Sequence, residues 1–153
     1  MDLASIRERI MATPLVGRLP EGMRQRFVMI LLWLSDTQEV SREETLFEQG
    51  ETNTDSGCLI LEGMVRIKTE SAGNKTIDAP DILGEVQLFT PNRQRTATVE
   101  VVVGGNVLIF SWHALAAAAK EHFTDTEFSE LKRVITESAW TREENLQQII
   151  KDM

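Results

Sequence analysis

The sequence has a single cysteine, Cys58, among its 153 residues. One cysteine excludes an internal disulfide and leaves no cysteine-based metal site. The two histidines, His113 and His122, do not stand at ligand spacing from carboxylates, so we predict no metal site. No combination of Ser, His and Asp suggests nucleophilic catalysis, and abundant carboxylates are typical of a solvated surface. We therefore predict no enzyme activity, no catalytic residues and no cofactor.

Basic residues are scarce as well. Lys and Arg number 16 against 24 Asp and Glu, which gives a formal net charge of -8. Binding to DNA or to an anionic membrane needs a basic surface, so this charge argues against both partners. A single phosphate can still be bound, because one arginine and a few oriented N–H groups act locally.

Long apolar runs are also absent. The longest, residues 27–34, is too short to span a bilayer, and the charged N-terminus lacks the apolar segment of a signal peptide. We expect no membrane association and a cytoplasmic location. The hydrophobic content of 42% predicts a sizeable core, and the length fits one domain over residues 1–153.

Apolar residues at helical spacing predict two helices near the N-terminus, at about residues 2–12 and 21–34. In the first of them, Leu3, Ile6 and Ile10 fall on one face. Each helix is therefore expected to be amphipathic and to bury its apolar side.

Between residues 37 and 110 the pattern changes to short runs with strand character. Turn clusters separate the runs every eight to twelve residues or so, which is typical of a barrel or sandwich. Residues 84–96 interrupt this rhythm, which indicates an insertion with a function.

Glycines between adjacent runs predict two hairpins. Gly63 separates residues 58–61 from residues 64–68, which suggests a tight turn between paired strands. The Gly104-Gly105-Asn106 turn separates two further runs in the same way.

Two helices are predicted at the C-terminal end. Ser111 is suited to cap a short helix that extends to about Glu121. A second cap at Thr124 or Asp125 predicts a long helix that extends to about Ile150.

Four segments together resemble a known family, in their order and spacing. They are Leu46-Phe47-Glu48-Gln49-Gly50-Glu51, Ile60-Leu61-Glu62-Gly63-Met64-Val65-Arg66-Ile67, Gly84-Glu85, and Arg95-Thr96-Ala97-Thr98-Val99. The chain resembles cyclic nucleotide-binding domains, the regulatory modules of catabolite activator proteins, cyclic-nucleotide-dependent kinases and cyclic-nucleotide-gated channels. The resemblance extends over about residues 15–115.

The resemblance implies an α+β fold, in which an eight-stranded antiparallel, jelly-roll-like β-roll is flanked by N-terminal helices and a long C-terminal helix. The domain would divide into N-terminal helices at residues 1–36, the β-roll at 37–110 with a phosphate-binding cassette at 83–98, and C-terminal helices at 111–153. About forty residues follow Phe110. We expect no DNA-binding domain, because a hinge helix and a helix-turn-helix need more.

The resemblance also implies which residues hold the ligand. The cassette residues are Leu83, Gly84, Glu85, Val86, Arg95, Thr96 and Ala97. Backbone N–H groups after Gly84 would face the cyclic phosphate at the start of a short helix. Glu85 would accept a hydrogen bond from the ribose 2′-hydroxyl, and Arg95 would bind the exocyclic phosphate oxygens through its planar fork. Thr96 would contact the phosphate or the base edge.

Alternatives stay open at these positions. Arg95 could instead be a surface or barrel-rim arginine paired with Glu85, and Arg93 could take its place at the phosphate. Glu85 could be a helix-start carboxylate favoured by the helix dipole. Trp140 could stack on the purine as a base cap, or it could fill a subunit contact or fold onto the roll.

We predict a stand-alone regulatory sensor that binds a cyclic mononucleotide, cAMP or cGMP, and signals through rearrangement of its C-terminal helix. The moved helix would change contact with an unidentified protein partner or with a second copy in a homodimer. Ser138 and Arg142 interrupt the apolar stripe that a strict coiled coil needs. The alternatives are a degenerate β-roll that binds no nucleotide and serves as a protein-interaction module, and a binder of another anion.

Overall fold

The computed structural model describes residues 1–51, 55–69, 73–84, 95 and 97–152, and it gives only the backbone at 69, 73 and 139–152. Within this part of the chain, three helices come first: α1 (Leu3–Met11), α2 (Pro14–Arg18) and α3 (Glu21–Leu34). The strands are β1 (Asp36–Val40), β2 (Thr45–Phe47), β3 (Ser56–Ile60), β4 (Met64–Thr69), β5 (Gly73–Asp78), β6 (Asp81–Leu83), β7 (Thr98–Val103) and β8 (Gly105–Ser111). The last helices are α4 (Trp112–His122) and α5 (Asp125–Asp152).

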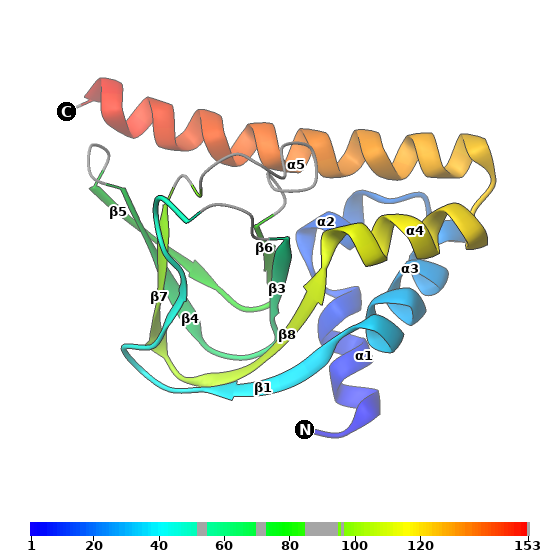
Figure 1. Cartoon of the computed structure of the whole chain (residues 1–153), viewed down its shortest axis with the longest axis horizontal. Helices are drawn as coiled ribbons and strands as arrows, with labels where there is room; N and C mark the ends of the chain where they lie inside the picture. The colour runs from blue at the N-terminus through cyan, green and yellow to red at the C-terminus, as the bar shows by residue number, and fades with distance from the viewer. Residues whose placement is uncertain (52–54, 70–72, 85–94, 96, 153) are drawn as a thin grey trace.

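The eight strands form two antiparallel sheets of four. Their orders are β1-β8-β3-β6 and β2-β7-β4-β5. The strands stand together on one side of the molecule, and helices α1 to α4 stand beside them (Figure 1). The predicted α+β fold, with its eight-stranded roll and C-terminal helix, is confirmed.

Both predicted hairpins are wrong. The strands on either side of Gly63 lie in different sheets, since β3 pairs with β6 and β8 whereas β4 pairs with β5 and β7. The strands on either side of Gly104 are likewise separated, because β7 belongs to one sheet and β8 to the other. Each glycine turn is a corner at which the chain crosses between sheets.

The two corners contact each other, which explains their glycines. A Cβ on Gly63, whose φ is +108°, would lie 2.3 Å from the Val103 carbonyl oxygen. A Cβ on Gly105 would lie 2.3 Å from the Glu62 carbonyl oxygen. Backbone therefore packs on backbone here, at a distance that excludes any side chain.

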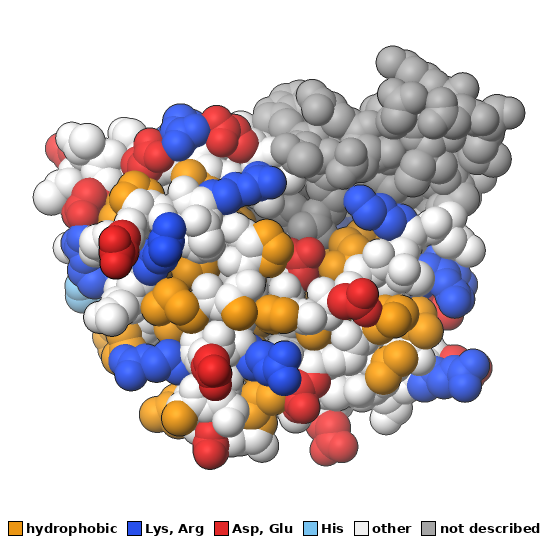
Figure 2. Space-filling model, turned by 180° about the vertical axis from the view of Figure 1, so that it is seen from behind, with side chains coloured by type: hydrophobic (Ala, Val, Ile, Leu, Met, Phe, Trp, Pro, Cys, Tyr) orange, Lys and Arg blue, Asp and Glu red, His pale blue; other side chains and the backbone are white. Residues whose placement is uncertain are grey.

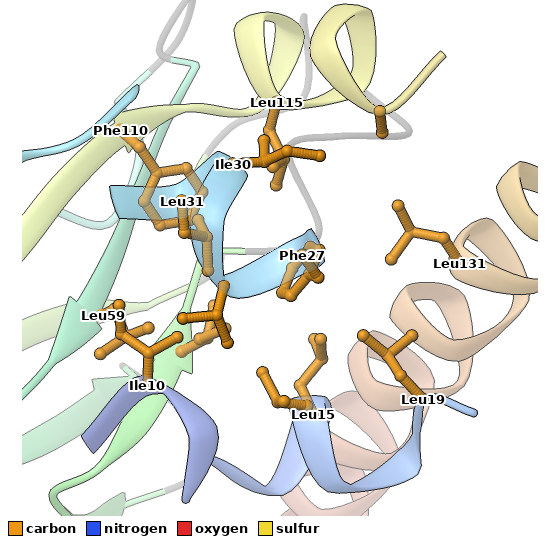
Figure 3. Close-up of a cluster of buried hydrophobic side chains, with 14 of the residues drawn as sticks. Ile10, Leu15, Leu19, Phe27, Ile30, Leu31, Leu59, Phe110, Leu115 and Leu131 are labelled. Carbon is orange, nitrogen blue, oxygen red and sulfur yellow. The ribbon is translucent and has the colours of Figure 1, made fainter. Parts of the chain in front are cut away.

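Strand β3 is buried on both faces and separates two hydrophobic clusters. Cys58 and Ile60 face the cluster inside the roll, and Leu59 faces the cluster formed with the helices. This alternation follows from the two-residue period of a strand. Figure 3 shows side chains of the helical cluster, in which Leu115 of α4 and Leu131 of α5 lie with residues of the N-terminal helices.

The helix predictions hold with two differences. Ser111 caps α4 by accepting a hydrogen bond from the Ala114 N–H at 3.1 Å. Thr124 caps α5, accepting from the Glu127 N–H at 3.1 Å. Sequence reasoning missed the short helix α2, which begins at Pro14. Leu3 is 69% exposed, so it does not share the burial of its expected neighbours on α1.

The surface carries both signs of charge. Figure 2 shows basic and acidic side chains interspersed over the described part of one face. None of the helices that the structure describes combines the length and the apolar character that a membrane crossing requires.

An ion pair joins the start of α5 to α3. Arg26 donates to both carboxylate oxygens of Glu127, with 3.0 Å from Nη1 to Oε1. The Arg26 guanidinium also lies 4.9 Å from the centre of the Phe123 ring. Hydrogen bonds from Arg26 and from the Thr124 backbone lower the pKa of Glu127 to about 2.

We expect Glu127→Gln to reduce the free energy of unfolding near neutral pH but not near pH 2. Glutamine can keep the helix cap, so the substitution removes mainly the charge. Because folding lowers the pKa of Glu127, its contribution is present above about pH 4.5 and is lost as the pH falls towards about 2. Urea denaturation of both proteins across this range measures the difference.

Glu8→Gln, which removes an exposed carboxylate on α1, is the control. Its difference from wild type in the free energy of unfolding should not disappear as the pH falls. A Glu127→Gln deficit that stayed constant across the whole pH range would contradict the prediction.

Candidate ligand-binding site

The predicted cassette begins at the end of β6, which is held against β3. Leu83 pairs with Cys58 in the sheet, and Gly84 follows it close to the Ser56 carbonyl. Gly84 has φ of +91°, and a Cβ there would lie 3.1 Å from the Ser56 carbonyl oxygen. The position needs glycine for its conformation and for its close neighbours.

Arg95 is held through its backbone by the turn after β2. Its N–H donates to the Glu51 carbonyl at 2.9 Å, and its carbonyl accepts from the Gly50 N–H at 3.0 Å. Nearby, the Gln49 N–H donates to the Thr98 hydroxyl at 3.0 Å. These bonds fix the backbone of Arg95 against the turn after β2.

The Arg95 side chain turns inward and is only 6% exposed. Its Nη2 donates to the Ser56 carbonyl at 2.7 Å, and its guanidinium lies 4.1 Å from the centre of the Phe47 ring. Its Nη1 is 3.0 Å from the position that a Cβ on Gly84 would take. The structure thus brings together Gly84 and Arg95, two of the residues predicted for the site.

Burial lowers the pKa of Arg95, and the carboxylates of Glu51 and Asp55 oppose that shift. The ordinary arginine pKa is so high that the group stays cationic in this environment. A buried cation that donates to one carbonyl and lies against an aromatic ring favours an anion, and a planar fork suits the oxygens of a phosphate.

Asp55 links this region to the start of α4. Its carboxylate accepts from the Ser111 hydroxyl, and its Oδ1 lies 2.6 Å from Nδ1 of His113. Its carbonyl accepts from the Trp112 N–H at 2.9 Å. Burial raises the pKa of Asp55, but the hydrogen bonds from Ser111 and His113 outweigh it and the net shift is downward. Sequence reasoning missed Asp55, which stands in an ordinary polar turn.

The other predicted site residues divide into two groups. Leu83 is buried in the cluster inside the roll, and Ala97 is half-buried against the same cluster. The side chains that lie outside the described part of the structure are Glu85, Val86, Arg93, Thr96 and Trp140. The backbone at Trp140 belongs to α5. The burial of Arg95 conflicts with a surface position, whereas its alternative pairing with Glu85 involves a residue outside the described part of the structure.

Comparison with known proteins supports the assignment of the fold. A family model described as cyclic nucleotide-binding domain matches residues 37–122. The sensor domain of the transcriptional regulator DNR from Pseudomonas aeruginosa is 18% identical, with a TM-score of 0.65, over 89% of this chain and 91% of that one. The structure of Sp-2Cl-cAMPS bound to PKAR CBD2 is 15% identical, with a TM-score of 0.70, over 97% of this chain and 92% of that one.

A regulatory protein from Silicibacter pomeroyi DSS-3 is 16% identical, with a TM-score of 0.64. The match covers 98% of this chain but 66% of that protein. No curated protein matches the sequence. At these identities the solved structures establish a shared fold.

The fold and the buried arginine define a β-roll domain that encloses a cationic side chain. The family model spans more than half of the chain, so the chain belongs to the cyclic nucleotide-binding domain family. Domains of this family are regulatory modules.

We expect Gly84→Ala to lower the free energy of unfolding by about 1–3 kcal/mol, because it forces a side chain into a left-handed backbone conformation. The new methyl would also meet Nη1 of Arg95 at 3.0 Å. Gly22→Ala on α3 is the matched control, since nothing lies within 4 Å of its Cβ position. Chemical denaturation should show no loss for the control. Equal stability of the two variants would contradict the role assigned to Gly84.

Proposed function

We propose that this domain is a regulatory sensor that binds a cyclic mononucleotide, cAMP or cGMP, in the cassette at residues 83–98. The observation that carries the proposal is the buried guanidinium of Arg95 held against Gly84. Family membership supplies the ligand class, and the site supplies a cation where the cyclic phosphate would lie.

The phosphate would complement Arg95 electrostatically. Taking a guanidinium out of water disfavours its charged form, as the lowered pKa of Arg95 indicates. A phosphate anion in contact would reverse that effect, and a short charge-assisted bond is stronger in a dry site than in water. In this proposal Glu85 accepts from the ribose 2′-hydroxyl, and Thr96 contacts the phosphate or the base.

A route from the site to the C-terminal helices runs through two neighbouring residues. Ser56 accepts the Arg95 hydrogen bond, and Asp55 before it contacts Ser111 and His113 at the start of α4. A phosphate that changed the position of Arg95 would therefore act on the segment that holds α4. We propose that binding shifts the population of C-terminal helix positions in this way.

We expect Arg95→Gln to weaken cAMP or cGMP binding at least about tenfold, because a hydrogen bond to a charged group contributes about 1.5–3 kcal/mol. Isothermal titration calorimetry measures the affinity. Arg93→Gln is the matched control, since it removes a second arginine of the same cassette, and it should bind like wild type. Arg95→Lys keeps a cation but loses the fork, and it should fall between the two.

Thermal unfolding of each variant separates lost binding from lost folding. If wild type gives no heat with cAMP or cGMP, the β-roll is better explained as a protein-interaction module. If another nucleotide stabilises it in a thermal-shift panel, the cassette serves a different anion.

The helix rearrangement predicts that a nucleotide changes the emission of Trp140. With Trp33 and Trp112 replaced by Phe, Trp140 is the remaining tryptophan. Either stacking on the purine or a changed contact of α5 alters its surroundings, so its fluorescence should shift as the nucleotide saturates. The same protein carrying Arg95→Gln should respond only at higher nucleotide concentration. An unchanged spectrum at saturation, with binding confirmed by calorimetry, would rule out the rearrangement at this helix.

A further inference from the structure

The carboxylate of Asp55, just before β3, is held by the first turn of α4. Its Oδ2 accepts from the Ser111 hydroxyl and from the His113 backbone N–H, the latter at 3.2 Å. Its Oδ1 is buried and lies 2.6 Å from Nδ1 of His113. Among the described residues, no other group is placed to hydrogen-bond Oδ1. This oxygen therefore depends on the His113 ring for its partner.

The contact determines where His113 carries a proton. A carboxylate oxygen and a ring nitrogen at this distance need a hydrogen between them, since both are otherwise acceptors. Hydrogen bonds lower the pKa of Asp55 despite its burial, so the carboxylate is ionised and the hydrogen is on Nδ1. A second proton, on Nε2, converts the hydrogen bond into an ion pair. The His113 side chain is 64% exposed, so its ring can exchange that proton with water.

The same carboxylate acts on Arg95. Asp55 precedes Ser56, whose carbonyl accepts from Nη2 of Arg95 at 2.7 Å. The negative charges of Asp55 and Glu51 both favour the cationic form of Arg95. A charge that favours the guanidinium opposes an anion bound to it, because like charges repel. The Asp55 carboxylate is therefore expected to lower the affinity of Arg95 for a phosphate.

Histidine is the side chain that ordinarily changes charge between about pH 5 and 8, and His113 is the one titratable residue in the first turns of α4, residues 112–118. The start of a helix favours the Asp55 carboxylate and disfavours a cation, so a charged imidazole here depends on Asp55. The turn after β2 adds the carboxylates of Glu48 and Glu51. Carboxylates and guanidinium groups ordinarily keep their charge in this range. Among the described residues around Asp55, His113 is therefore the group that titrates.

We propose that a proton on His113 increases the affinity of Arg95 for a cyclic nucleotide, an inference that rests on the function proposed above. When His113 is neutral, the Asp55 charge opposes the phosphate. When His113 is protonated, the ion pair offsets that charge, and the phosphate meets a more cationic site. Because coupling is reciprocal, phosphate binding also favours proton uptake by His113. Both residues act through Arg95 and tune the site without touching the ligand.

Isothermal titration calorimetry with cAMP and with cGMP at pH 5.5, 6.5 and 8.0, at constant ionic strength, tests the inference. A cyclic phosphodiester keeps its single charge over this range, so the ligand contributes no titration of its own. We expect the affinity to rise about three- to tenfold from pH 8.0 to pH 5.5, as for one charge added beyond direct contact. At pH 6.5, buffers of different ionisation enthalpy should reveal proton uptake on binding.

Three variants locate the titrating group. His113→Gln should bind with an affinity that does not change with pH. His122→Gln is the matched control, because it removes the only other histidine, at the last residue of the same helix, and it should keep the wild-type pH dependence. Asp55→Asn should bind more tightly than wild type at pH 8.0 and should lose most of the pH dependence. If Asp55→Asn fails to fold, His113→Gln still decides, since it changes an exposed side chain.

The contact itself is tested without nucleotide. Thermal unfolding of wild type, Asp55→Asn, His113→Gln and the double variant forms a double-mutant cycle at pH 5.5 and at pH 8.0. We expect the two single losses of melting temperature to be non-additive, and more so at pH 5.5, where the contact is an ion pair.

Several results would overturn this inference and leave nucleotide binding standing. They are a wild-type affinity that is independent of pH, an unchanged pH dependence in His113→Gln, loss of that dependence in His122→Gln, or additive losses of melting temperature at both pH values. The absence of any heat with cAMP and cGMP at all three pH values would instead remove the proposed function, and this inference with it.

Discussion

Arg95 is a cation placed inside the β-roll, and the segments around it are arranged to accommodate that charge. The turn after β2 holds its backbone, the start of β3 supplies a carbonyl, and β2 supplies the face of Phe47. Gly84 follows β6 without a Cβ because the guanidinium and the Ser56 carbonyl occupy that space. An ion removed from water needs such partners, since burial alone penalises its charge. Three separate parts of the sequence therefore converge on one side chain.

Strand β3 connects this centre to the rest of the molecule. Its alternate residues belong to the two hydrophobic clusters, so the roll and the helical layer share one strand. Just before it, Asp55 contacts the first residues of α4, and its neighbour Ser56 accepts from Arg95. The start of β3 therefore lies between the capped start of α4 and the predicted ligand site. This arrangement connects the buried Arg95 to the start of α4 through contacts at the start of β3.

Local charge and overall charge differ in this protein, and the local charge decides what can bind. The chain is acidic overall, yet it buries the guanidinium of Arg95. At ordinary ionic strength, exposed charges more than about 10 Å apart are largely screened, whereas buried groups are screened much less. A buried cation can therefore act on its immediate surroundings although the chain as a whole is acidic.

The sequence by itself determined the elements and the residue types. Apolar spacing identified α3 and α5, Ser111 and Thr124 marked the helix starts, and the order of short motifs indicated the family and its arginine. Such signals depend on residues that are close in the sequence, so they can be recognised without the tertiary structure. Only the tertiary structure decided which strands pair: the turns at Gly63 and Gly104 look like hairpins locally, but the chain crosses to the other sheet at each of them. Strands β3 and β8 pair instead with strands that are distant in the sequence or with each other. The contacts of Asp55 likewise appear only when distant segments meet, because nothing in a polar stretch of sequence specifies its neighbours at the start of α4.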